Sequence, residues 1–145
     1  MTVTVAEMKK IENRAIELGF STALMMENAG RSVAEVIWER FNPKVTGKIC
    51  VICGSGNNAG DALAAARHLA LIGYSVEAYL VSGSVKGENP QLMLRLAEIL
   101  IPIIKRPPTK EELKKCEIII DGIFGTGIRG DVAEPYSSVI DDING

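Results

Sequence analysis

The chain has 145 residues, of which 47% are hydrophobic, and its 16 basic and 18 acidic side chains leave a formal net charge of −2. This length and composition suit one domain with an ordinary core. The chain has no basic block and only one Trp, three Tyr and three Phe, which argues against a nucleic-acid partner. No apolar run approaches a membrane span and the first residues do not resemble a signal peptide, so we expect a cytoplasmic protein with no membrane partner.

Two amphipathic helices are predicted first. Apolar spacing predicts a helix that Thr4 caps and that runs to about Leu18, where Gly19 ends it. A second helix is predicted over residues 22–41. Its expected apolar stripe consists of Leu24, Met25, Ala29, Val33, Val36 and Ile37.

Strands and helices then alternate. The pattern predicts strands at 48–53, 75–81, 101–104 and 117–121, and helices at 59–73, 89–100, 109–115 and about 134–143. Such a series forms a three-layer α/β/α, Rossmann-like, doubly wound and mainly parallel sheet, here preceded by the two N-terminal helices. We expect one domain over residues 1–145, with its ligand beyond the carboxyl ends of the strands.

The first predicted strand ends in a glycine-rich loop. Gly54 and Gly56 permit backbone angles and a close approach that larger residues do not. The loop departs from the usual nucleotide fingerprints, because no acidic residue ends the second strand and no Lys-Ser/Thr pair follows the loop. Ordinary NAD and ATP sites are therefore disfavoured.

Three oxygen-bearing side chains, Asn57, Asn58 and Asp61, follow that loop within five residues. They are able to bind a hydroxyl, an amide or a hard cation. Alternatively, the two asparagines only form a turn and Asp61 only caps the next helix. The sequence leaves both interpretations open.

A second polar cluster follows the last predicted strand. Asp121 stands where that strand ends, and the glycine-rich stretch 125–130 carries Thr126 and Arg129, which offer a hydroxyl and a cation suited to phosphate. Because parallel strands end at one edge of a sheet, both loops should line one cleft, with Asn58 facing Asp121. Taken alone, Asp121 could equally be a turn cap and Arg129 a solvated side chain.

The cysteines and the single histidine are expected to be structural. Cys50 and Cys53 lie three apart in one strand, so they face opposite sides with Cα atoms about 10 Å apart, too far for a disulfide. Cys116 stands alone and supports no disulfide framework. His68 lies two helical turns beyond Asp61, which favours a packing or surface residue over a general base.

Three separated segments carry a family resemblance: Met-Met-Glu-Asn-Ala-Gly-Arg at 25–31, Gly-Ser-Gly-Asn-Asn-Ala-Gly-Asp at 54–61 and Asp-Gly-Ile-Phe-Gly-Thr-Gly at 121–127. In this order they resemble the NAD(P)H-hydrate epimerase family, the YjeF N-terminal domain. The resemblance implies an isomerase, usually a homodimer, that interconverts the epimers of hydrated NADH or NADPH in metabolite repair. In many microbes the domain is fused to an ADP- or ATP-dependent NAD(P)H-hydrate dehydratase.

The resemblance also implies the site residues. Asn58 and Asp121 would contribute oxygens to a potassium ion, for which neutral and singly charged oxygen ligands are suited. The hydrated dinucleotide would be held by Asn57, Asn58, Ala59, Gly60, Asp61, Gly125, Thr126, Gly127, Ile128, Arg129, Gly130 and Asp131.

The family pattern continues beyond the last predicted helix into an Asp-x-Pro-Ser-Gly segment, whose Asp is the implied catalytic acid or base. This sequence stops at Gly145, before that segment. We therefore expect a C-terminally truncated domain that is inactive by itself, with its catalytic residue beyond 145. A non-catalytic ligand-binding or scaffold module of the same fold remains the alternative.

Overall fold

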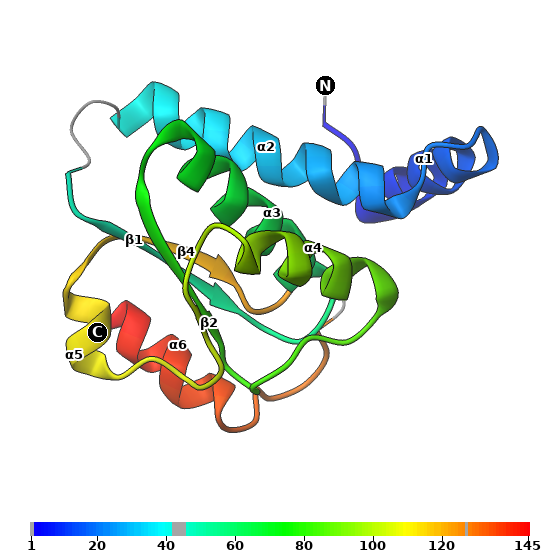
Figure 1. Cartoon of the computed structure of the whole chain (residues 1–145). Helices are drawn as coiled ribbons and strands as arrows, with labels where there is room; N and C mark the ends of the chain where they lie inside the picture. The colour runs from blue at the N-terminus through cyan, green and yellow to red at the C-terminus, as the bar shows by residue number, and fades with distance from the viewer. Residues whose placement is uncertain (1, 42–45, 127) are drawn as a thin grey trace.

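A four-stranded, fully parallel sheet forms the centre of the computed structural model, which describes residues 2–41, 46–126 and 128–145 (Figure 1). The strands lie in the order β3-β2-β1-β4. They span Lys48–Cys53 (β1), Ser75–Leu80 (β2), Ile103–Ile104 (β3) and Cys116–Gly122 (β4). The helices span Val5–Glu17 (α1), Thr22–Phe41 (α2), Asn57–Ile72 (α3), Glu88–Glu98 (α4), Lys110–Lys114 (α5) and Tyr136–Asn144 (α6).

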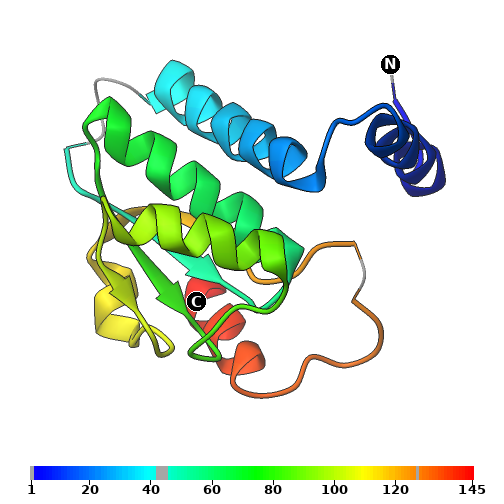
Figure 2. The same cartoon turned by 45° about the vertical axis from the view of Figure 1, so that its right-hand side comes forward.

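Helices cover both faces of the sheet, as expected. Helices α3 and α4 lie on one face with α2 outside α3, and α5 and α6 lie on the other (Figures 1 and 2). Strand β1 serves both layers: Val51 and Cys53 face the core under α3, whereas Cys50 and Ile52 face α5 and α6, and all four are fully buried. The α/β/α prediction is confirmed.

Most predicted elements are present with small shifts of their ends. The consequential shift is at α3, which begins at Asn57 and not at Ala59. Asn57 and Asn58 therefore belong to the first turn of the helix and not to a loop. The third strand is reduced to Ile103 and Ile104.

The apolar stripe predicted for α2 was wrong. The buried residues of this helix are Met26, Gly30, Ala34 and Ile37, and only Ile37 belongs to the predicted stripe. The reason is the partner helix, because α3 presents the buried alanines Ala64 and Ala65 and lets small residues of α2 approach closely. Backbone contact across small residues outweighs the burial of larger side chains here.

We expect Gly30→Ala to lower the free energy of unfolding by about 1–3 kcal/mol through overpacking. A Cβ atom at Gly30 would lie 2.5 Å from the backbone nitrogen of Ala65, so the two helices would have to separate. The higher helix propensity of alanine offsets about 1 kcal/mol at most. The control is Ser32→Ala on the exposed side of α2, which urea denaturation should place within about 0.5 kcal/mol of wild type. Equal stability of both variants would contradict this packing.

Helix α1 stands at the edge of the molecule (Figure 2). Thr4 and Glu7 form the predicted cap, a capping box in which each side chain binds the backbone N–H of the other residue. None of its residues is buried. Within the described residues, no helix combines the length and apolar character needed to cross a bilayer.

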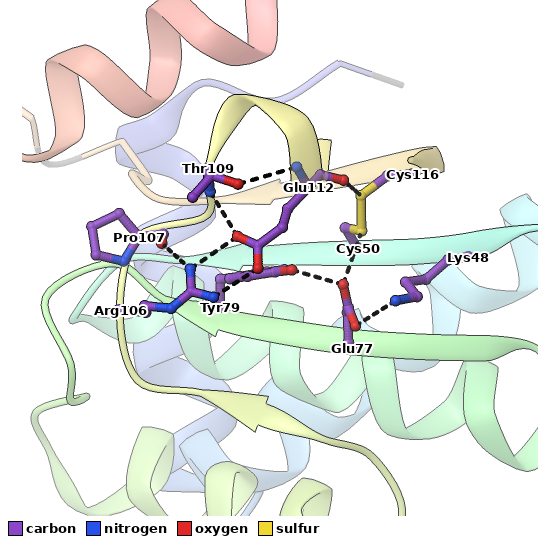
Figure 3. A network of polar contacts seen from close by, with 9 residues as sticks. All are labelled: Lys48, Cys50, Glu77, Tyr79, Arg106, Pro107, Thr109, Glu112 and Cys116. Carbon is purple, nitrogen blue, oxygen red and sulfur yellow. Dashed lines mark hydrogen bonds and ion pairs between the residues drawn. A yellow bond between two sulfur atoms is a disulfide. The ribbon is translucent and has the colours of Figure 1, made fainter. Parts of the chain in front are cut away.

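The expectation that Cys116 stands alone was wrong, because Cys116 forms a disulfide with Cys50 across strands β1 and β4 (Figure 3). Their Cα atoms are 5.8 Å apart. The pairing register skips Glu117, since Lys48 is opposite Cys116 while Ile49 is opposite Ile118. This β-bulge reverses the alternation of β4 and turns Cys116 to the face where Cys50 lies. Cys53 is buried on the opposite face as a free thiol, as predicted.

Polar contacts surround the disulfide (Figure 3). The Tyr79 hydroxyl donates to Glu77 at 2.8 Å, and Glu77 also pairs with Lys48 at 2.8 Å. Arg106 binds both carboxylate oxygens of Glu112, at 2.7 and 2.9 Å. Tyr79 and the half-buried Cys116 belong to the cluster on the α5–α6 face of the sheet, and none of the residues in these contacts lines the cleft described next.

Candidate functional site

A cleft lies beyond the carboxyl ends of β1 and β4. From β1 the chain turns into α3 on one face of the sheet, whereas from β4 it continues toward α6 on the other. Such a topological switch point is where open α/β sheets bind their ligands. The cleft has a volume of about 710 Å³ and is lined by Glu12, Ser55, Gly56, Asn57, Asn58, Asp61, Ile123, Phe124, Gly125, Thr126 and Ile128.

The first turn of α3 forms one wall of this cleft. Its N-cap is Gly56, which has no side chain to bind the first N–H groups of the helix. Uncapped N–H groups at a helix N-terminus, together with the helix dipole, favour an anionic group. This end of α3 is therefore suited to an anionic group such as the phosphate that the sequence predicted.

The Asn58 side chain joins the two segments that the sequence singled out. Its Nδ2 donates to the carbonyl oxygen of Phe124 at 2.9 Å, which leaves its amide oxygen as an acceptor. Gly54 brings the backbones together, because its N–H donates to Gly122 at 3.0 Å. A Cβ atom at Gly54 would lie 2.0 Å from the carbonyl oxygen of Ile123, so only glycine fits here.

Asp121 lies at the same end of the sheet, opposite Ile52 in the β1–β4 register. Its Oδ1 accepts the backbone N–H of Ile123 at 2.9 Å, which closes the turn after β4. The structure therefore shows a turn-stabilising contact for Asp121, and among the described residues it does not line the cleft. That its second oxygen and Asn58 share a ligand stays a prediction.

The structure gathers some predicted ligand residues and separates others. Asn57, Asn58, Asp61, Gly125, Thr126 and Ile128 line the cleft. Ala59 and Gly60 are buried in the helix packing, where Gly60 lies against Met26. Arg129, Gly130 and Asp131 are exposed beyond the lining residues, and Gly127 lies outside the described residues.

Five lining residues were absent from the prediction. Ser55 and Gly56 belong to the glycine-rich loop, and Ile123 and Phe124 to the segment after β4, so reading each loop as a whole would have included them. Glu12 carried no such signal. It reaches the cleft from α1, and its place depends on how that helix packs.

Asp61 has an unusually high pKa for an aspartate in this cleft. Its side chain is half-buried, and desolvation together with the nearby carboxylate of Glu12 raises the pKa of Asp61 to about 6. Since a cap would hold its carboxylate on backbone N–H groups, this setting argues against the proposed cap role.

His68 does not belong to the cleft. Its Nε2 lies 2.6 Å from Glu27, and Arg67 also pairs with Glu27, so the three side chains join α2 to α3. The ion pairs and hydrogen bonds from Arg67 and His68 lower the pKa of Glu27 in spite of its partial burial. The packing role predicted for His68 is confirmed.

Fold and cleft together define a Rossmann-like domain with a cleft at its switch point. The family model described as YjeF-related protein N-terminus matches residues 22–145. The chain is 35% identical to the NAD(P)H-hydrate epimerase of Nitrosopumilus maritimus over 148 residues, covering 99% of the chain and 68% of that protein. It is 38% identical to the enzyme of the same name from Cenarchaeum symbiosum, covering 100% and 68%.

The chain belongs to the YjeF-related N-terminal domain family. A further relative, the bifunctional NAD(P)H-hydrate repair enzyme Nnr of Archaeoglobus fulgidus, is 37% identical over 98% of the chain, which spans only 29% of that protein. The crystal structure of yeast ynu0 superposes with a TM-score of 0.85 at 25% identity, covering 99% of this chain and 65% of that one.

Proposed function

We propose that the cleft binds hydrated NADH or NADPH and that the domain serves the interconversion of the two hydrate epimers. The observation that carries this proposal is a cleft between α3 and the segment after β4, lined by residues of both glycine-rich segments, which lie within the stretch that the family model matches. Relatives named as NAD(P)H-hydrate epimerases support the assignment.

The chemistry of the cleft suits such a ligand. Its volume of about 710 Å³ falls within the range of roughly 300–1,000 Å³ for small-molecule sites. The uncapped N–H groups of α3 suit a pyrophosphate, and the Asn57 and Thr126 side chains offer hydrogen bonds to sugar or amide groups. Exposed Arg129 follows the lining residue Ile128 in the chain and adds a cation to this segment.

The donor set at Asn58 and Asp121 fits a potassium ion. The Asn58 amide uses its nitrogen on Phe124 and keeps its oxygen, and Asp121 uses one oxygen on Ile123 and keeps the other. Hard oxygen donors of this kind suit an alkali cation and not zinc. When bound, the ion would supply positive charge near the carboxyl ends of β1 and β4.

We expect potassium to raise the melting temperature more than sodium does, and Asp121→Asn to weaken that response. A ligand that binds only the native state stabilises it by mass action, and the substitution removes the charged donor. The matched control is Asp141→Asn, an exposed aspartate on α6. Identical responses to both cations in all three proteins would exclude the potassium site.

The epimerase assignment is tested with the purified (R)-epimer of NADPH hydrate. Calorimetry should show binding to the 145-residue chain, and chromatography then follows the appearance of the (S)-epimer. We expect faster exchange in an extended chain that carries an Asp-x-Pro-Ser-Gly segment, since general acid or base catalysis contributes about 10²–10⁴ in rate. Failure of both chains to bind the hydrate would exclude the proposed ligand.

The same comparisons support further parts of the proposal. The bifunctional relatives suggest fusion to a second repair domain, which we take to be a dehydratase that uses ADP or ATP. We also propose that the protein forms a homodimer and is located in the cytoplasm. A scaffold module of the same fold is the second candidate, and it would bind the hydrate without exchange in the extended chain as well.

A further inference from the structure

Two carboxyl side chains from distant parts of the chain line the same cleft. Glu12 projects from α1, and Asp61 lies one turn inside α3. Both line the main cleft, and both also line an adjoining hollow of about 270 Å³ between α1, α2 and the start of α3. Asp61 therefore lies where the two spaces join.

The surroundings of Asp61 offer its carboxylate little compensation. Among the described residues, no hydrogen-bond donor contacts it. Besides Asp61 itself, the charged side chains that line the two spaces are Lys9 and Glu12, both from α1. Helix α2 contributes Thr22, Met25, Met26 and Ala29, and the described lining of the segment after β4 is uncharged.

We propose that the Glu12 carboxylate makes Asp61 the proton acceptor of the cleft, so that the cleft takes up a proton when an anionic dinucleotide binds. Glu12 is then a positioning residue that acts through Asp61, and α1 has the role of bringing it there. The proposal rests on the proposed function for the identity of the ligand, but the effect of Glu12 on Asp61 is a property of the ligand-free protein.

Electrostatics supports an effect of Glu12 on Asp61 and gives the direction in which affinity should change with pH. Burial and the Glu12 carboxylate raise the pKa of Asp61 to about 6, so Asp61 is mainly ionised at neutral pH in the free protein. A pyrophosphate in the cleft adds further negative charge, which raises that pKa again and favours the neutral carboxyl group. Affinity should be highest below pH 6 and fall by up to about tenfold per pH unit above it, until the pKa of the complex is passed.

The first experiment titrates the Asp61 carboxyl group by carbon NMR in the ligand-free protein. In Glu12→Gln the midpoint should fall from about 6 toward the ordinary value for aspartate, because a neighbouring negative charge is removed. The matched control is Glu17→Gln, also on α1, whose carboxylate pairs with Arg14 at 2.8 Å and does not line the cleft. A midpoint that is unchanged in Glu12→Gln, or that shifts equally in the control, overturns the proposal.

The second experiment measures proton uptake by calorimetry at pH 7 in buffers of different ionisation heat, with NADPH hydrate as the probe. Wild type and Glu17→Gln should take up the same fraction of a proton for each ligand bound. Glu12→Gln should take up a smaller fraction, and Asp61→Asn should take up no proton. Undiminished uptake in Asp61→Asn overturns the assignment to this pair. If the probe does not bind, the proposed function fails, and the NMR titration alone decides whether Glu12 controls the protonation of Asp61.

Discussion

Cys116→Ser is expected to lower the free energy of unfolding by about 2–4 kcal/mol. The disulfide joins residues 66 positions apart, and closing a loop of that length restricts the unfolded chain. The disulfide also links β4 covalently to β1. This link stabilises β4, because its other edge has no partner strand among the described residues. Cys116 is the better member to replace, since it is half-buried whereas Cys50 is fully buried.

The measurement is thermal unfolding with and without a dithiol reductant. Wild type should lose stability on reduction, down to the level of Cys116→Ser, and the variant should not respond. Cys53→Ala is the control, because it removes a buried thiol from the other face and should change stability equally in both conditions. Titration of three free thiols in denatured, unreduced wild type would show that the disulfide does not form.

Gly54→Ala is expected to cost about 1–3 kcal/mol or more and to remove ligand binding. The new methyl group would lie 2.0 Å from the carbonyl oxygen of Ile123, which is backbone and cannot rotate away. The segment after β4 would have to move outward, and Phe124 and Gly125 would move with it. The substitution should therefore lower the free energy of unfolding and distort the cleft at the same time.

The matched control is Gly56→Ala, two residues further on. A Cβ atom there meets nothing within 4 Å, and its backbone angle of −111° is open to alanine. We expect a cost of about 1 kcal/mol at most, because alanine is a poorer N-cap than glycine but meets no steric clash here. Denaturation by urea and calorimetric titration with NADPH hydrate measure both effects. A Gly54→Ala variant that is as stable as Gly56→Ala and binds as tightly would contradict the close approach of β1 and β4.

Both variants act on the junction of β1 and β4, at its two ends. The disulfide lies near the start of β4, and Gly54 lies just past the end of β1. The cleft depends on this junction because its walls are the segments that leave the two strands. A substitution that separates the strands at either end should therefore affect the ligand site as well as the stability.

Local patterns in the sequence predicted most of the fold. Some structural features depend only on residues close together in the chain. They include the buried strand β1, the helix start at Thr4 and the glycine-rich turns, and the structure contains each of them. The place of the cleft was also predictable, since parallel strands end at one edge of a sheet. Asn57, Asn58 and Asp61 could be found in this way because they follow a strand directly.

Tertiary structure decided what depends on register and on packing between remote segments. One skipped residue, Glu117, turns Cys116 toward Cys50, and strand periodicity by itself gives no sign of such a bulge. The buried face of α2 follows from the alanines of α3, and Glu12 reaches Asp61 only through the position of α1. The sequence by itself thus determined the elements, their order and the edge of the sheet that carries the site, because these rest on local periodicity and chain direction. The three-dimensional packing determined which side chains meet there, because each such contact depends on the relative placement of two elements that the chain does not join directly.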